Sequence, residues 1–206
     1  MDTAGYFIDL DSDGWEDFVS VQYGINAIEI FFNNQGEFFE DTGRTNIYVE
    51  KPTFSVAATD FDLDGDVDLF MAHWGAAWQE DEPLTGYLWE NDGTGHFTDR
   101  SNIVDIVPSF RPPPFDDVLA EHSFTPIFAD VNGDPYPDLL LASDFEASQV
   151  LLNDNGMAFR GLNDLKAISD ERHGAAGGAL TTGTVISTGS FQASSIRKKR
   201  RSMRVA

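Results

Sequence analysis

Short apolar runs alternate along the chain with acidic, glycine-containing breaks. Three of these breaks share one pattern: DLDSDGWED (residues 9–17), DFDLDGDVD (60–68) and DVNGDPYPD (130–138). Each break has a short lead-in of apolar or small residues, and each is followed by an apolar run, FVSV, LFMA or LLLA. Apolar runs bounded by Asp, Asn and Gly are typical of antiparallel strands. The pattern therefore predicts three strand–acidic loop–strand units.

A second landmark follows each acidic loop, in IFFNNQGEFF (30–39), YLWENDGTGHF (87–97) and VLLNDNGMAF (150–159). Each is an apolar strand that ends at an Asn, continues through a Gly turn and resumes at a Phe. One unit thus contains four strands in about 50 residues, which is typical of a β-propeller blade. We predict an all-β fold, a partial propeller of about three four-stranded blades over residues 1–165, with repeats at about 4–43, 54–101 and 124–164.

The spacing of the units is uneven, because 51 residues separate Asp9 from Asp60 but 70 separate Asp60 from Asp130. The excess lies mainly in VPSFRPPPFDDVLAEH (107–122), whose three consecutive prolines disfavour regular structure. This stretch is predicted to be an exposed insertion. Insertions of repeat proteins often lie on the binding face, although a spacer without function fits the sequence equally well.

Composition limits the classes of partner that the chain can bind. The chain of 206 residues has 35 acidic and 13 basic residues and a formal net charge of −22, which excludes nucleic acid and favours cations or basic partners. Cysteine is absent, so no disulfide or thiolate metal site is available. No apolar run is long enough to span a membrane. The first residues carry no signal peptide and reach the first acidic motif at once, so we expect an incomplete gene product.

The tail, residues 166–206, differs from the rest and is predicted to be irregular. It has no acidic residue after Glu171, and six of the 13 basic residues lie in 197–206. Such a cluster has two common interpretations. It is either a nuclear-localisation or nucleic-acid patch, or a disordered tail. We favour a third: translation in a frame shifted by one nucleotide. In the original frame, the codons of TTGTVISTGS (181–190) would encode an acidic motif. This segment would then be a degenerate fourth repeat.

The acidic loops have the chemistry of a calcium site. Calcium takes six to eight oxygen ligands, which Asp side chains at alternating positions and a backbone carbonyl at the seventh position would supply. The predicted ligands are Asp9, Asp11, Asp13, Trp15 and Asp17; Asp60, Asp62, Asp64, Asp66 and Asp68; and Asp130, Asn132, Asp134, Tyr136 and Asp138. An EF-hand is excluded, because its Glu at the twelfth position is replaced by Ser20, Met71 and Leu141. The simpler alternative is three Asp-rich turns with solvated carboxylates.

Together with the apolar runs that follow them, the three motifs resemble the FG-GAP/VCBS repeats of integrin alpha-subunit propellers. The Asn-Gly-Phe turns and DFEASQVLLNDNG (144–156) are most similar to bacterial proteins of the ASPIC/UnbV group. The resemblance implies a propeller of seven or eight blades, calcium in up to three of the loops present, and an extracellular, cell-surface or periplasmic location. The third loop departs from the pattern, with Gly133 at its fourth position and Pro135 where the others have Gly.

No motif for catalysis is present: HExxH, GxSxG and a Gly-rich phosphate loop are all missing. We therefore expect a calcium-binding, non-enzymatic propeller segment for extracellular recognition or cell adhesion, with a protein or carbohydrate ligand that the sequence does not identify. The alternative is a fragment of a propeller-bearing, polysaccharide-active enzyme whose catalytic groups lie elsewhere.

Overall fold

The computed structural model describes residues 2–22, 28–40, 43–77, 84–107, 109–110, 119–144 and 148–162. In these ranges the chain is almost entirely β-strand, with one short 3-10 helix, η1 (Ser101–Ile103). The strands are β1 (Asp2–Ile8), β2 (Asp17–Gln22), β3 (Ile28–Asn34), β4 (Glu37–Glu40), β5 (Thr53–Thr59), β6 (Asp68–Ala77), β7 (Leu88–Asn91), β8 (Phe97–Asp99), β9 (Ser109–Phe110), β10 (Leu119–Ala129), β11 (Asp138–Ser143), β12 (Gln149–Asn153) and β13 (Phe159–Gly161). The prediction of an all-β fold is confirmed.

The strands form three antiparallel meanders of four strands each: β1–β4, β5–β8 and β10–β13. We call them the first, second and third meander. Each contains the predicted order of strand, acidic loop, strand, connector, strand, Asn-Gly turn and strand. The alternating residues of β2 are buried, as expected for a strand with one face on a core.

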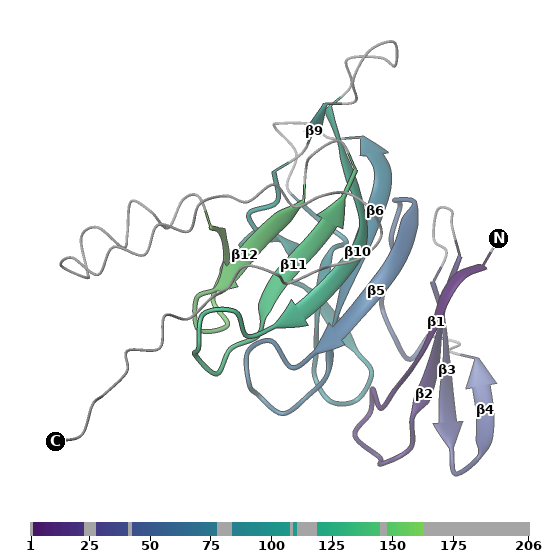
Figure 1. Cartoon of the computed structure of the whole chain (residues 1–206). Coiled ribbons are helices and arrows are strands. Elements are labelled where there is room, and N and C mark those ends of the chain that lie inside the picture. The colour runs from purple at the N-terminus through teal and green to yellow at the C-terminus, as the bar shows by residue number, and fades with distance from the viewer. Residues whose placement is uncertain are drawn as a thin grey trace, which may run out of the picture.

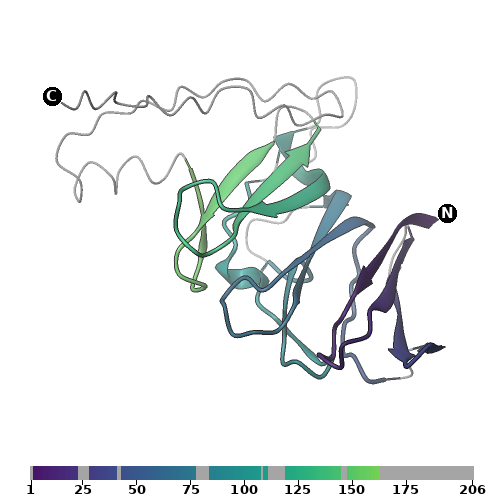
Figure 2. The same ribbon diagram turned by 60° about the horizontal axis from the view of Figure 1, so that its bottom comes forward.

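The second and third meanders are also joined to each other. The start of β10 pairs with the end of β6, through Ala120 with Ala77 and His122 with Trp74. Together with β9, which pairs with β10, these strands form one nine-stranded sheet, whereas β1–β4 is a separate sheet. The meanders follow one another as a curled array (Figures 1 and 2). This arrangement fits a partial propeller, and the number of blades stays a prediction.

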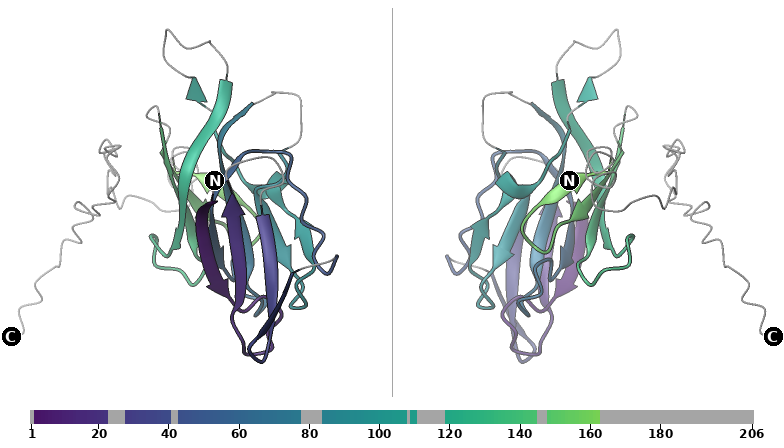
Figure 3. Two further views of the ribbon diagram at one scale, coloured as in Figure 1. Left: turned by 90° about the vertical axis from the view of Figure 1, so that its right-hand side faces the viewer. Right: turned by 90° about the vertical axis from the view of Figure 1, so that its left-hand side faces the viewer.

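Two apolar cores hold the array together, one at each boundary between meanders. The first contains Val19 and Phe32 of the first meander with Leu69 and Trp89 of the second. The second contains Phe61 and Phe70 of the second meander, and its members from the third meander are Leu139, Leu141, Leu151 and Phe159. Each meander is therefore stabilised by burial against its neighbour, as in repeat proteins generally. In the left panel of Figure 3, the sheet β1–β4 lies nearest the viewer at the edge of the array.

The three acidic loops lie at the same end of the array, where β1 turns into β2, β5 into β6 and β10 into β11 (Figure 1). Most of the Pro-rich insertion, the tail 166–206 and the degenerate fourth repeat fall outside the described residues. Among the residues described, no helix is long and apolar enough to cross a membrane.

Candidate metal centres

The first two acidic loops share one backbone conformation. Ser12 and Leu63, at the fourth position, have φ values of 56° and 64°. At the sixth position, Gly14 and Gly65 have φ values of 88° and 105°. Only glycine adopts this left-handed region without cost, which explains the Gly at the sixth position. The two loops are therefore built alike from the same residue types.

The aspartate at the first position closes each of these loops through backbone hydrogen bonds. Asp9 accepts from the N–H groups of Asp13 at 3.2 Å and Gly14 at 3.0 Å. Asp60 accepts from the corresponding N–H groups of Asp64 at 3.1 Å and Gly65 at 3.0 Å. These bonds fold each loop back on its first residue and bring its carboxylates close together.

Two clusters of three carboxylates result. One consists of Asp9, Asp11 and Asp17, and the other of Asp60, Asp62 and Asp68. In each cluster, one oxygen from every residue lies within 4.8 Å of the other two. Oxygen ligands of one calcium ion, each 2.3–2.6 Å from it, lie at such separations from one another. The structure thus brings together the first, third and ninth positions of the first two predicted sites.

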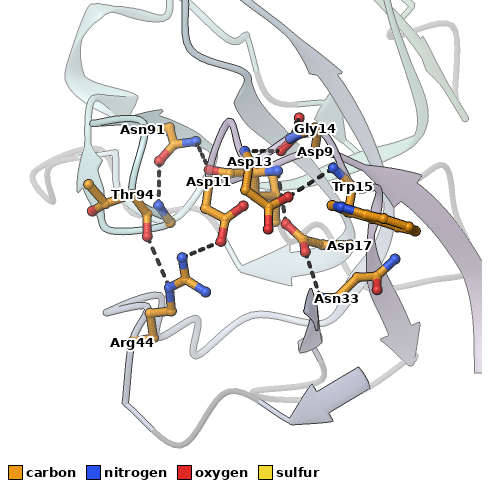
Figure 4. A network of polar contacts seen from close by, with 12 residues as sticks. Asp9, Asp11, Asp13, Gly14, Trp15, Asp17, Asn33, Arg44, Asn91 and Thr94 are labelled. Atoms are coloured by element: carbon orange, nitrogen blue, oxygen red, sulfur yellow. Dashed lines mark hydrogen bonds and ion pairs between the residues drawn. The ribbon is translucent and has the colours of Figure 1, made fainter. Parts of the chain in front are cut away.

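The ninth-position aspartates are completely buried, and their carboxylates accept hydrogen bonds from the backbone, as Figure 4 shows for Asp17. Asp17 accepts from Leu10 N–H at 2.9 Å with one oxygen and from Asn33 N–H at 2.8 Å with the other. Asp68 and Asp138 accept in the same way from the second loop position and from the Asn of the third strand. Each of these carboxylates therefore fixes its loop to the strand that leads into the Asn-Gly turn.

Burial affects the protonation of these aspartates. Burial raises the pKa of Asp68 to about 7, despite the two backbone N–H groups that favour its charged form. It also raises the pKa of Asp17, Asp138 and Asp62; for Asp62 the neighbouring carboxylate of Asp64 adds to the effect. A bound cation would favour the ionised forms and oppose these shifts.

The first cluster has a protein cation beside it. Arg44 forms an ion pair with Asp11 through one oxygen of that carboxylate, and Arg44 Nε donates to the carbonyl of Thr94 at 3.1 Å (Figure 4). The guanidinium also lies 3.8 Å above the ring of Phe32. The other oxygen of Asp11 is buried and has no hydrogen-bond partner among the described residues. In the described part of the chain, this oxygen is therefore left available to a cation.

The fifth-position side chains of all three loops turn to the backbone. The carboxylates of Asp13, Asp64 and Asp134 accept from the N–H groups of Trp15, Asp66 and Tyr136 at 2.8–3.0 Å. These seventh-position residues, predicted to offer their carbonyls, therefore have their N–H groups held toward the loop. Their roles and those of the fifth-position aspartates as ligands stay predictions.

The third loop differs from the other two. Gly133, with φ of 94°, takes the left-handed conformation at the fourth position, and Pro135 at the sixth cannot adopt it or donate a hydrogen bond. The amide of Asn132 donates to Asp134 at 2.7 Å, which directs it to a carboxylate of its own loop. The ligand set of Asp130, Asn132, Asp134, Tyr136 and Asp138 stays a prediction.

The Asn at the end of each third strand connects the parts of the site. Asn153 Nδ2 donates to the carbonyls of Pro137, in its own acidic loop, and Phe61, in the preceding loop, at 3.1 and 2.8 Å. Asn91 makes the same pair of bonds, to Val67 and to Leu10 of the preceding loop. Sequence reasoning placed these Asn residues in turns but missed this role, and it missed Arg44. The repetition of Asn at this position was a visible signal of its connecting role, whereas nothing in the sequence marked Arg44.

Comparison with known proteins agrees with this geometry. Residues 9–71 match the family model described as FG-GAP-like repeat. The match begins at the first aspartate of the first loop and ends in β6, just beyond the second loop, so it covers both carboxylate clusters. No curated protein matches the chain. The similarity to the ASPIC/UnbV group stays a prediction. Residues 9–71 are thus similar to an FG-GAP-like repeat, in a chain whose antiparallel meanders fit a partial β-propeller.

Proposed function

We propose that the chain is a calcium-binding, non-enzymatic propeller segment of a protein that acts in recognition or adhesion outside the cytoplasm. The observation that carries the proposal is the pair of carboxylate clusters in the first two acidic loops, each with three oxygens within 4.8 Å. Like charges at such separations repel one another unless a cation lies among them.

The donor set favours calcium over other ions. It consists of oxygen atoms only, and Asp11 adds a buried oxygen without a partner in the described part of the chain. Calcium accepts such sets with irregular geometry, whereas magnesium requires a tight octahedron and retains several waters. Transition metals prefer the imidazole and thiolate ligands that these loops lack.

The metal would have a structural role. Asp17 and Asp68 connect their loops to the third strands, and Asn91 and Asn153 connect the loops of adjacent meanders. A cation bound to these aspartates would therefore stabilise the boundaries between meanders as well as the loops. A ligand that binds only the folded state raises the stability of that state by RT ln(1 + [L]/Kd), which increases with the ligand concentration.

The surroundings of the buried histidine support a non-enzymatic role. His73 lies in the core, with Nε2 2.9 Å from the carbonyl of Gly86 and Nδ1 3.3 Å from the hydroxyl of Thr53. Both ring nitrogens are thus used to hold strands together.

The proposed calcium ion favours an extracellular location, because the millimolar calcium found there fills sites of modest affinity.

Calorimetric titration of the full chain with calcium tests the proposal. We expect saturable binding to the wild-type protein and loss of one class of site in Asp62→Asn, which removes a charge from the second cluster. Asp66→Asn is the matched control: it removes the same charge from the same loop, at a position whose predicted contribution is its backbone carbonyl. Absence of binding at millimolar calcium, or equal losses in both variants, would contradict the proposal.

A further inference from the structure

An unbroken path of three buried hydrogen bonds connects the two carboxylate clusters. It begins at Asp17 of the first cluster, which accepts from the N–H of Leu10 at 2.9 Å. The carbonyl of Leu10 accepts from Asn91 Nδ2 at 2.7 Å, and the backbone N–H of Asn91 donates to Asp68 of the second cluster at 2.9 Å. This path, which we call the Asn91 relay, thus joins one proposed ligand of each metal site through a single residue.

The relay lies where its hydrogen bonds are strong. Its first and last bonds each end on a carboxylate, and hydrogen bonds to an ionised group are about twice as strong as those between neutral groups. The side chain of Leu10 belongs to the apolar core between the first and second meanders, together with Leu69 and Trp89. In surroundings of such low polarity, hydrogen bonds in a chain polarise and strengthen one another. A change at one carboxylate therefore affects the bond at the other.

Arg44 forms a second connection between the first loop and the turn that follows Asn91. Its guanidinium pairs with Asp11, and its Nε donates to the carbonyl of Thr94 at 3.1 Å (Figure 4). The same turn is closed by the N–H of Gly95, which donates to Asn91 Oδ1 at 3.2 Å. The turn of the second meander and the first acidic loop are therefore held together at two places.

The first cluster has an independent mark of a cation site. The side chain of Asp11 is 9% exposed, and its Oδ1 atom is buried without a hydrogen-bond partner among the described residues. A buried polar atom without a partner destabilises the folded state, and a cation beside it would remove this cost. The second cluster has the same arrangement of three carboxylates. The relay therefore joins two sites of one kind.

We propose that Asn91 makes the two sites cooperative, so that calcium binding by one loop raises the affinity of the other. This inference rests on the proposed function. When binding in the second loop fixes Asp68, it also fixes Asn91 and, through the amide, the carbonyl of Leu10. The first loop then loses less conformational freedom when it binds in turn. The effect is reciprocal between the sites. Repulsion between the two ions opposes it, and added salt screens this repulsion.

Titration of the full chain with calcium, in buffer with raised potassium chloride, tests the cooperativity. The fluorescence of Trp15, which is 45% exposed, follows the first loop. We expect the first loop to bind about fivefold more weakly in Asp62→Asn, in which the second loop is impaired, than in the wild type. Asp66→Asn is the matched control, because it removes the same charge from the same loop outside the cluster. Equal weakening in both variants would overturn the proposal, because it indicates an effect of charge alone.

A second comparison tests whether the relay carries the effect. Asn91→Ala removes the amide but keeps the backbone N–H that serves Asp68. In this background the further change Asp62→Asn should leave the affinity of the first loop unchanged. In Asn153→Ala, which loses the corresponding amide at the next boundary, Asp62→Asn should still weaken the first loop. Circular dichroism verifies that each variant is folded. Because the first comparison needs no change at Asn91, it tests the proposal even if Asn91→Ala does not fold.

The outcomes separate this inference from the proposed function. Two loops that bind calcium independently in the wild type would overturn the cooperativity and leave the proposed function standing. The same holds if Asp62→Asn weakens the first loop equally with and without the amide of Asn91, because the relay then transmits nothing. Absence of calcium binding by the wild-type protein would overturn both.

Discussion

The side-chain amide of Asn153 donates a hydrogen bond of 2.8 Å to the backbone carbonyl of Phe61, which lies 92 residues earlier in the chain. The bond crosses the boundary between the second and third meanders and ends at the second position of the second acidic loop. Close beside it, Gly156 approaches the backbone and Cβ of Asp62 so tightly that a side chain at Gly156 would clash. The Asn-Gly turns of the second and third meanders thus support the acidic loop of the preceding meander.

Asn153→Ala should therefore destabilise the protein more than the loss of a turn residue alone. It removes hydrogen bonds to Phe61, Pro137 and Gly156, and each contributes about 1 kcal/mol, for a loss of about 2–4 kcal/mol in the free energy of unfolding. Urea denaturation measures this loss. Asn33→Ala is the control, because the bonds of Asn33 to Glu16 and Gly36 stay within the first meander. Equal losses in the two variants would show that the bond across the boundary contributes nothing.

Local features of this fold could be predicted from the sequence because each is encoded by adjacent residues. The strands are short apolar runs, the loops carry Asp at fixed spacing, and the turns carry Gly. The departure of the third loop was also visible, because Pro135 excludes the conformation that Gly14 and Gly65 adopt.

Contacts between distant residues could not be predicted in the same way. Asp68 was identified as a ligand from its spacing, but its second role depends on Asn91, 23 residues away on another strand. The ion pair of Arg44 with Asp11 joins residues 33 apart, and a single basic residue in a connector carries no pattern. The pairing of β6 with β10 likewise follows from how the meanders lie in space.

Asp62→Asn should have opposite effects with and without calcium. In chelator, the substitution removes a carboxylate whose pKa is raised by burial and by repulsion from Asp64, so stability should rise by up to about 1 kcal/mol. In calcium, the loss of a ligand should reduce the stabilisation that the metal provides. Thermal unfolding with chelator and with millimolar calcium measures both effects. A variant that is less stable than the wild type in chelator would argue against repulsion in the metal-free loop.

His73 should make the protein sensitive to acid. Burial lowers the pKa of His73 from 6.5 to about 3, and the charge of Lys51 contributes to the shift. Between these values the unfolded chain binds the proton and the folded chain does not. The contribution of His73 is therefore complete above pH 6.5 and is lost as the pH falls, by up to about 1.4 kcal/mol per pH unit.

A comparison of the wild type with His73→Gln isolates the contribution of His73 to stability. The carboxylates with raised pKa values, including Asp68, are common to both proteins. We expect the difference between their free energies of unfolding to shrink as the pH is lowered from 7 toward 4, with urea denaturation as the measurement and calcium held fixed. A difference that stays constant over this range would mean that His73 is protonated in the folded protein, contrary to its burial.

Arg44 should set the calcium affinity of the first loop below that of the second. Its guanidinium forms the ion pair with Asp11, one of the three clustered carboxylates, and the second cluster has no such cation in the described part of the chain. Arg44→Gln should therefore tighten calcium binding by the first loop several-fold, since one unit of competing positive charge is removed. In chelator the same variant should be less stable, because the contact with Asp11 and the stacking on Phe32 are lost.

The titration is best performed in the Asp62→Asn background, where the second loop is impaired. The fluorescence of Trp15, which lies in the first loop and is 45% exposed, reports on the nearby metal, and a Trp15→Phe variant identifies its share of the signal. Arg44→Lys retains the charge without the planar guanidinium, so it should leave the affinity near that of the wild type if charge is the cause. A gain in affinity that is equal in Arg44→Gln and Arg44→Lys would instead attribute the effect to the geometry of the ion pair.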